Sequence, residues 1–252
     1  MAWINEKLSN ARVRFLSGKI KEYEPFSVTS GDILRATLKP CDVLLVEGNQ
    51  RFSVAVKYLT QSTWSHAAMY VGDISEALNS EHKSYMLIEA DIKKGVHALP
   101  LSFYEGYNTR ICRPVGLTDE DRQRIIDYML DSIGMGYDLK NVIDLARYLI
   151  PTPPVPIRWR RRMLSLGSGD PTRVICSTRI AQAFQHVKYP ILPHVEVTTR
   201  YTGMYHYTME EILHIRHHSL FTPRDFDLSP YFKVVKPTIE KDFDYQQLTW
   251  NK

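Results

Sequence analysis

The sequence lacks the features that mark several specialised classes of protein. Its 252 residues include three cysteines, an odd and small number that excludes a disulfide framework and favours a reducing compartment. No run of residues approaches the ~20 apolar residues of a membrane-spanning helix. The charged start of the chain has no apolar centre like that of a secretory signal. We therefore expect a cytoplasmic globular protein.

Known cofactor motifs are also missing. The sequence contains no glycine-rich phosphate loop and no Gly-x-Ser-x-Gly elbow. His214, His217 and His218 have the spacing of metal ligands on one helix face, but no cluster of cysteines or carboxylates accompanies them. We interpret this segment as a polar helix end, and we expect neither a metal nor a cofactor.

The charge balance is mildly basic, with 32 Lys and Arg against 28 Asp and Glu, a net charge of +4. Basic residues gather in residues 1–21 and in Arg158–Arg162, which points to an anionic partner, either nucleic acid or lipid headgroups. Aromatic residues are scattered rather than placed as stacking platforms, so we do not expect nucleic acid. An arginine-mediated nucleic-acid binder is kept as a less favoured hypothesis.

The arginine cluster at Arg158–Arg162 includes Trp159 and Arg160 and precedes Cys176 in the chain. Arginine and tryptophan suit an interface with an anionic headgroup. One interpretation is that Trp159 and Arg160 bind substrate and bring the protein into peripheral contact with an anionic membrane. The other is a solvated loop anchored by one tryptophan.

The hydropathy pattern indicates one α+β domain, with 44% hydrophobic residues in all. Residues 3–16 alternate apolar and basic residues at helical spacing, so residues 1–30 are assigned an N-terminal amphipathic helix. The main domain spans residues 31–237, and a polar tail spans 238–252. A chain of this size buries roughly 70–75% of its unfolded surface.

Short β-branched runs, separated by turn residues, predict an antiparallel sheet. Helical patterns follow these runs, and the first of them begins with acidic residues in its first turn. A proline- and arginine-rich loop covers 151–172, and a last strand ends near residue 236. The expected strands are 42–48, 65–73, 85–90, 96–99 and 109–113, and the expected helices are 119–132, 139–149 and about 174–186.

Cys176 differs from the other two cysteines in its place on a predicted element. Cys41 and Cys112 lie next to or inside predicted strands, where a cysteine is usually a small buried apolar residue. Cys176 lies at the start of a predicted helix, where backbone N–H groups and the helix dipole favour a thiolate. Cys176 is therefore the candidate nucleophile.

Two titratable residues lie on consecutive predicted strands. His66 lies inside a predicted apolar strand, and Glu89 is flanked by apolar residues in the next one. A buried histidine needs partners for its ring nitrogens, and a carboxylate beside it would fix its tautomer and stabilise its charged form. Without such a partner, His66 would be an ordinary core histidine.

The ordered set of motifs resembles the YiiX/YebB-like group of NlpC-type papain-like cysteine hydrolases. In that group the fold is circularly permuted, so the histidine strand precedes the cysteine helix. The same order occurs in this chain, where His66 precedes Cys176 by 110 residues. The motifs that carry the resemblance are Gly48, Ser65–Gly72, Leu87–Ala90, Gly136–Asp138 and Ile175–Ser177.

The resemblance implies a papain-like α+β fold and a set of residue roles. Cys176 would be the nucleophile, His66 the general base and Glu89 the residue that orients the imidazole. Tyr137 and Ser177 would shape the substrate site.

The implied activity is hydrolysis or acyl transfer at an amide, ester or thioester bond. The group's permuted members are associated with lipid-like or acylated substrates. The alternative is a catalytically silent module of the same fold that binds a lipid or a peptide.

Overall fold

The structure of the protein is a computed structural model. It describes residues 29–136, 176–201 and 207–237, apart from 77, 79–83, 92, 93 and 215, together with residues 25, 244 and 246. The predicted helices 3–16 and 139–149 and the loop 151–172 lie outside the described residues, as does almost all of the 238–252 tail.

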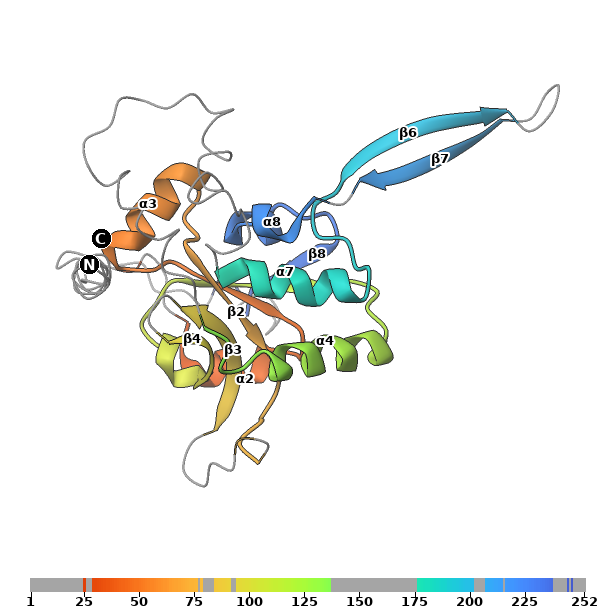
Figure 1. The fold of residues 1–252 in the computed structure, drawn as a ribbon. Coiled ribbons are helices and arrows are strands. Elements are labelled where there is room, and N and C mark those ends of the chain that lie inside the picture. Colours follow the sequence, from red (N-terminus) through yellow and green to blue (C-terminus); the bar gives the residue numbers. More distant parts are fainter. Residues whose placement is uncertain are drawn as a thin grey trace, which may run out of the picture.

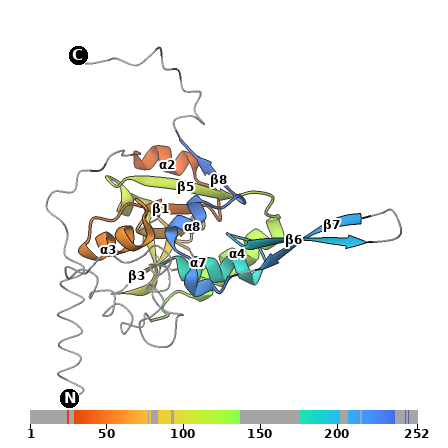
Figure 2. The ribbon, with the colours of Figure 1, turned by 90° about the horizontal axis from the view of Figure 1, so that it is seen from above.

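One six-stranded sheet organises the domain, with the strand order β4-β3-β2-β1-β5-β8 and every neighbouring pair antiparallel (Figures 1 and 2). The predicted antiparallel sheet is confirmed, and five of its strands fall where the apolar runs placed them. The strands are β1 (Val43–Val46), β2 (His66–Tyr70), β3 (Tyr85–Asp91), β4 (Gly95–Pro100), β5 (Thr109–Pro114) and β8 (Phe232–Val235).

Helices cover both faces of this sheet. The predicted helices at 119–132 and 174–186 are present as α4 and α7, and α4 begins where the Thr118 hydroxyl accepts from the backbone N–H of Asp121. Every helix in the described part of the chain is too short or too polar to cross a bilayer. The helices are α2 (Gly31–Thr37), α3 (Arg51–Thr60), α4 (Asp119–Asp131), α7 (Cys176–His186) and α8 (Pro223–Asp227), with 3-10 turns η1 (Leu101–Tyr104) and η3 (His218–Leu220).

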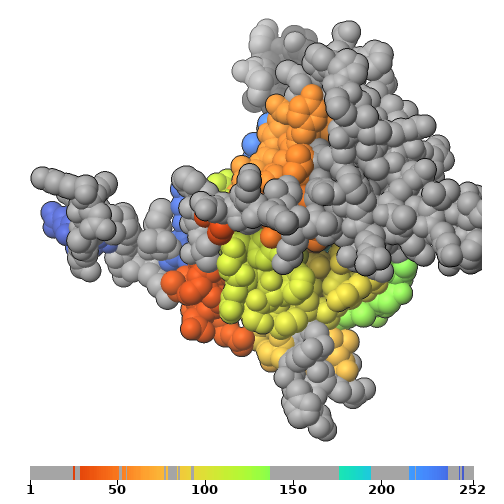
Figure 3. All heavy atoms as spheres, turned by 90° about the vertical axis from the view of Figure 1, so that its left-hand side faces the viewer, coloured from red at the N-terminus to blue at the C-terminus, as the bar shows by residue number. Residues whose placement is uncertain are grey.

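Alternation along the strands divides the core into two clusters. In β3, Ile88 belongs to the cluster that includes α4 and α7, whereas Leu87 belongs to the cluster that includes α2 and η1. Glu89 therefore lies on the same face as Leu87. In Figure 3 the red surface of α2 adjoins the yellow-green surface of the segment that begins at η1.

Strands β6 (His194–Tyr201) and β7 (Tyr207–His214) form a separate two-stranded sheet. Both ribbon views show this hairpin extending away from the rest of the domain (Figures 1 and 2). The expectation of a helix end at His214 is wrong. His214 closes β7 opposite His194, because β6 and β7 are rich in β-branched and aromatic residues, such as Val195, Val197 and Ile212, which favour an extended chain over a helix.

Candidate active site

Cys176 is the first residue of the described part of α7, and it is 6% exposed. The helix buries a stripe of apolar residues that includes Ile180, Ala181 and Phe184, and this packing holds its N-terminal end against the sheet. The first N–H groups of a helix have no partner within it, so the sulfur lies where negative charge is favoured.

His66 lies within hydrogen-bonding reach of the Cys176 sulfur. Nε2 of His66 donates to Oε2 of Glu89 at 2.7 Å, so Nδ1 is the ring nitrogen left for the thiol. Burial alone would lower the pKa of His66. The adjacent Cys176 sulfur and Glu89 carboxylate outweigh that effect and raise its pKa well above the ordinary value. The arrangement therefore favours the imidazolium form of His66 beside the sulfur.

Glu89 is a buried carboxylate, 3% exposed, with side chains close to both oxygens. Oε2 accepts from His66 and from the Tyr104 hydroxyl, and Oε1 faces Nε2 of His97 at 3.4 Å. Burial raises the pKa of Glu89, but His66 and then Tyr104 and His97 more than reverse this, so its pKa is lowered. Glu89 is therefore held as the carboxylate.

The strand register explains why these residues meet. Met69 of β2 pairs with Ile88 of β3, and the same register extended by one residue places Glu89 beside Ala68. Glu89 is then the diagonal neighbour of His66 on one face of the sheet. His97 of β4 lies directly opposite Glu89. The structure thus brings two of the candidate site residues, His66 and Glu89, within hydrogen-bonding distance on adjacent strands, and their catalytic roles stay predictions.

Two residues of this cluster were missed by the sequence analysis. His97 could have been found, because an antiparallel pairing of the predicted strands 85–90 and 96–99 brings it close to Glu89. Tyr104 could not have been found from periodicity, since it ends a single 3-10 turn after β4. Its hydroxyl reaches Glu89 because η1 folds back over the sheet beside α2.

The segment that precedes His66 is fixed from two sides. The backbone N–H of Gly48 donates to the Ser65 hydroxyl at 2.9 Å, and a Cβ at Gly48 would collide with that hydroxyl. The Trp64 indole donates to Asp227 of α8 at 3.1 Å, and Arg110 pairs with the same carboxylate while stacking on the indole ring. These contacts set where β2 begins.

The other two cysteines differ sharply from Cys176. Cys41 and Cys112 are fully buried. Burial raises the pKa of Cys41 to about 12, and burial also raises the pKa of Cys112 strongly. Their interpretation as small apolar core residues agrees with these positions.

The remaining predicted site residues have separate outcomes. The Ser177 side chain is fully buried and its hydroxyl donates to the Phe221 carbonyl at 2.7 Å, so only its backbone N–H is left for a substrate. Tyr137, Trp159 and Arg160 lie outside the described residues. Their predicted contacts with substrate stay predictions.

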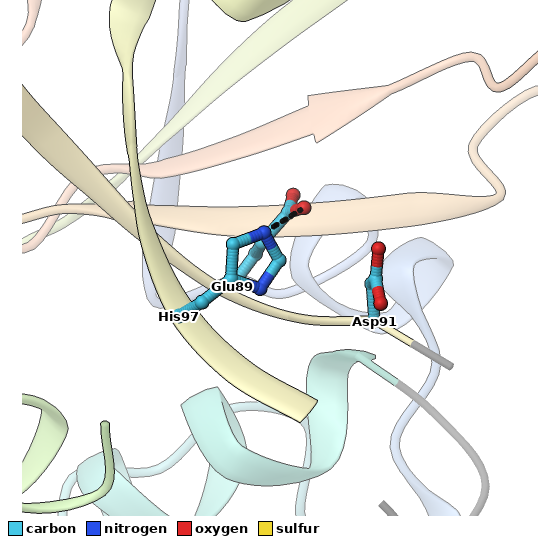
Figure 4. A group of neighbouring side chains, drawn as sticks. All are labelled: Glu89, Asp91 and His97. Carbon is cyan, nitrogen blue, oxygen red and sulfur yellow. Dashed lines mark ion pairs between the residues drawn. The ribbon is translucent and has the colours of Figure 1, made fainter. Parts of the chain in front are cut away.

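Glu89, Asp91 and His97 could together hold a cation, since their ligand atoms lie within 4.8 Å of one another. Figure 4 shows Asp91 on the same side of β3 as Glu89, with His97 beside the Glu89 carboxylate. Nitrogen and oxygen donors of this kind suit a transition metal such as zinc. Glu89 already contacts His66, so a metal there would share its carboxylate with the imidazole.

Comparison with known proteins confirms the resemblance that the motifs indicate. Residues 37–148 match the family of permuted papain-like amidase enzymes described as YaeF/YiiX, C92. The matched span contains His66 and Glu89 and ends before Cys176. The crystal structure of YiiX from Escherichia coli O157:H7, titled a metalloprotein, aligns with a TM-score of 0.47 and 14% identity, covering 85% of this chain and 98% of that one. No curated protein matches the sequence.

Residues 37–148 are therefore similar to the permuted papain-like amidases, and the mixed fold with an antiparallel sheet is that expected from the sequence. The family is one of amidases, which supports a hydrolase.

Proposed function

We propose that the protein is a cysteine-dependent hydrolase that cleaves amide, ester or thioester bonds through Cys176, His66 and Glu89. One observation carries the proposal: the Cys176 sulfur lies close enough to His66 to raise the pKa of its imidazole, whose Nε2 is bonded to a buried carboxylate. A thiol, a base and an orienting acid in this order are the parts that nucleophilic catalysis by cysteine requires.

Acylation would begin from the thiolate–imidazolium pair. The Cys176 sulfur attacks the substrate carbonyl carbon and forms a C–S bond, while backbone N–H groups at the start of α7 stabilise the oxyanion. The carbon–heteroatom bond then breaks, and Nδ1 of His66 gives its proton to the leaving nitrogen, oxygen or sulfur. The product at this stage is an acyl thioester on Cys176.

Deacylation would use the same groups in reverse. His66, now neutral, takes a proton from water, and the resulting hydroxide attacks the thioester carbonyl. The carboxylic acid departs and Cys176 returns as the thiolate beside the imidazolium. An alcohol or amine in place of water would make the same protein an acyltransferase.

The proposed substrate class is acylated or lipid-like, as the resemblance implies. The arginine-rich segment, with Trp159 and Arg160, would bind the anionic headgroup and hold a cytoplasmic protein at the membrane periphery. Flotation with vesicles containing anionic lipid tests this part. A variant with Arg160, Arg161 and Arg162 changed to Glu should float much less, and equal flotation would remove the headgroup role.

A chain-length series of p-nitrophenyl esters tests the activity, with mass spectrometry to detect an acyl group on Cys176. We expect hydrolysis that is lost in Cys176→Ala and His66→Ala, and kept in Cys112→Ala. Binding of acylated ligands without turnover or an acyl-enzyme would favour the silent binding module instead. Turnover that survives in Cys176→Ala would refute the thiol mechanism.

A further inference from the structure

Tyr104 makes a contact that the proposed mechanism does not yet use. The residue is 4% exposed, and its hydroxyl donates to Oε2 of Glu89, the same oxygen that accepts from Nε2 of His66. The phenol ring lies 6.1 Å from the His66 ring, measured between centroids. One carboxylate oxygen therefore joins the tyrosine to the histidine.

The ring of Tyr104 is held firmly. Phe103 and Tyr107 pack edge-on against it, with centroids 5.2 and 5.6 Å away. Leu101 of the same turn is buried in the cluster beneath α2. A ring fixed in this way directs its O–H along one line, so the hydroxyl acts as a preorganised donor.

The charges around the hydroxyl keep it protonated. Burial raises the pKa of Tyr104 well above its ordinary value, and the Glu89 carboxylate raises it further. Among the described residues, the titratable groups near Glu89 are His66 on β2, Asp91 on β3, His97 on β4 and Tyr104 on η1. The His97 contact is longer, at 3.4 Å against 2.7 Å for His66, so the donors on Oε2 dominate the position of the carboxylate.

We propose that Tyr104 is a positioning residue of this site: its hydroxyl fixes Oε2 of Glu89 against Nε2 of His66, and so keeps Nδ1 of His66 directed at the Cys176 sulfur. The inference rests on the proposed function. Tyr104 acts through Glu89 and touches neither substrate nor sulfur in this role. Loss of the hydroxyl would leave the carboxylate less well oriented and the imidazolium less stabilised.

The test is the pH dependence of Cys176 alkylation by iodoacetamide in the full-length protein, read from the Cys176 peptide by mass spectrometry. In Tyr104→Phe we expect the acid limb to move up by about one pH unit, because a hydrogen bond to a charged group is worth about that much. Alkylation would be up to about tenfold slower below the midpoint and equal at high pH. Tyr107→Phe, which removes a hydroxyl from the neighbouring ring, should leave the profile in place.

Two further variants separate positioning from packing. In a Glu89→Gln background, Tyr104→Phe should cause no additional shift, because its route to His66 is gone. Replacing Tyr104 by 3-fluorotyrosine keeps the ring and strengthens the donor, so the acid limb should move down; this measurement also serves if Tyr104→Phe does not fold. An unchanged profile in folded Tyr104→Phe, an equal shift in both backgrounds, or an upward shift with 3-fluorotyrosine would overturn the proposal.

Alkylation reads the thiolate and not turnover. A Tyr104 effect on the profile in a protein that hydrolyses no ester would leave the positioning role standing while the hydrolase proposal fails. The opposite pairing, turnover with no Tyr104 effect, would remove Tyr104 alone.

Discussion

Selective alkylation of Cys176 is the most direct test of the site. At pH 7 a thiol with a pKa of about 12, such as Cys41, is ionised to about one part in 10⁵. An unperturbed thiol with a pKa near 8.5 is ionised to about 3% under the same conditions. Ionisation alone therefore makes Cys41 roughly 3,000-fold less reactive than a free thiol, before its complete burial slows access further.

Cys176 should react much faster than Cys41 or Cys112, because its sulfur lies beside the imidazole of His66 and is not fully buried. A short iodoacetamide pulse followed by peptide mapping should then modify Cys176 at least about 10³-fold more than Cys41 or Cys112. Complete unfolding in guanidinium, where all three thiols are equivalent, provides the reference for peptide recovery.

The variant His66→Ala isolates the contribution of the imidazole. Removing the imidazole beside the sulfur should slow alkylation of Cys176 about tenfold or more at pH 6.5, because a neighbouring cation favours the charged form of the nucleophile. Refutation would be a rate that does not change in His66→Ala, or equal slow labelling of all three cysteines in the folded protein. Either result would mean that sulfur and imidazole do not act as a pair.

Two further predictions concern stability. The raised pKa of His66 stabilises the fold fully below about pH 6.5 and less as the pH rises through the folded pKa, whereas the lowered pKa of Glu89 stabilises the fold above about pH 4.3 and less as the pH falls. The melting temperature, measured from pH 3 to 10, should therefore decline towards both ends of the range, and Glu89→Gln should flatten both declines. Melting temperatures of wild type and Glu89→Gln that change with pH in parallel would contradict the coupling. Asp42→Asn should cost about 3–5 kcal/mol in urea unfolding, because Arg113 bonds the buried Asp42 carboxylate through two nitrogens at 2.8 and 2.7 Å, and a loss below about 1 kcal/mol would contradict this.

The sheet could be predicted from the sequence because its strands are dense apolar runs bounded by turn residues. β3, for example, was expected at 85–90 and is found at Tyr85–Asp91. Helix α3 was missed, because Arg51–Thr60 contains a phenylalanine, two valines and a tyrosine, residues with strand propensity, and no side chain caps its start. Tertiary contacts, rather than local propensity, determine that this segment is a helix.

The chemistry of the site was partly readable for a similar reason. A polar residue in an apolar strand is conspicuous, so His66 and Glu89 could be identified and their pairing anticipated. Tyr104 sits among aromatic residues in a short turn, where a tyrosine attracts no attention in sequence. Its importance arises from the return of η1 over the sheet, which no local pattern encodes.

The site depends on the docking of α7, because Cys176 comes from one layer of the fold and Tyr104 from the other. Phe184 holds α7 in place, fully buried and with Tyr189, Phe226 and Phe232 around it. Phe184→Ala should cost about 3–5 kcal/mol, a loss similar to that expected for Asp42→Asn.

Asp42 lies at the opposite end of β1 from the Val46–His66 pair, which makes Asp42→Asn a matched control for Phe184→Ala. At a temperature where both variants remain folded, Phe184→Ala should slow Cys176 alkylation at pH 6.5 severalfold, since a loosened helix moves the sulfur away from the imidazole. Asp42→Asn should leave that rate near wild type. Equal alkylation rates in the two variants would mean that the reactivity of Cys176 does not depend on the packing of α7 against the sheet, and therefore not on its distance from His66.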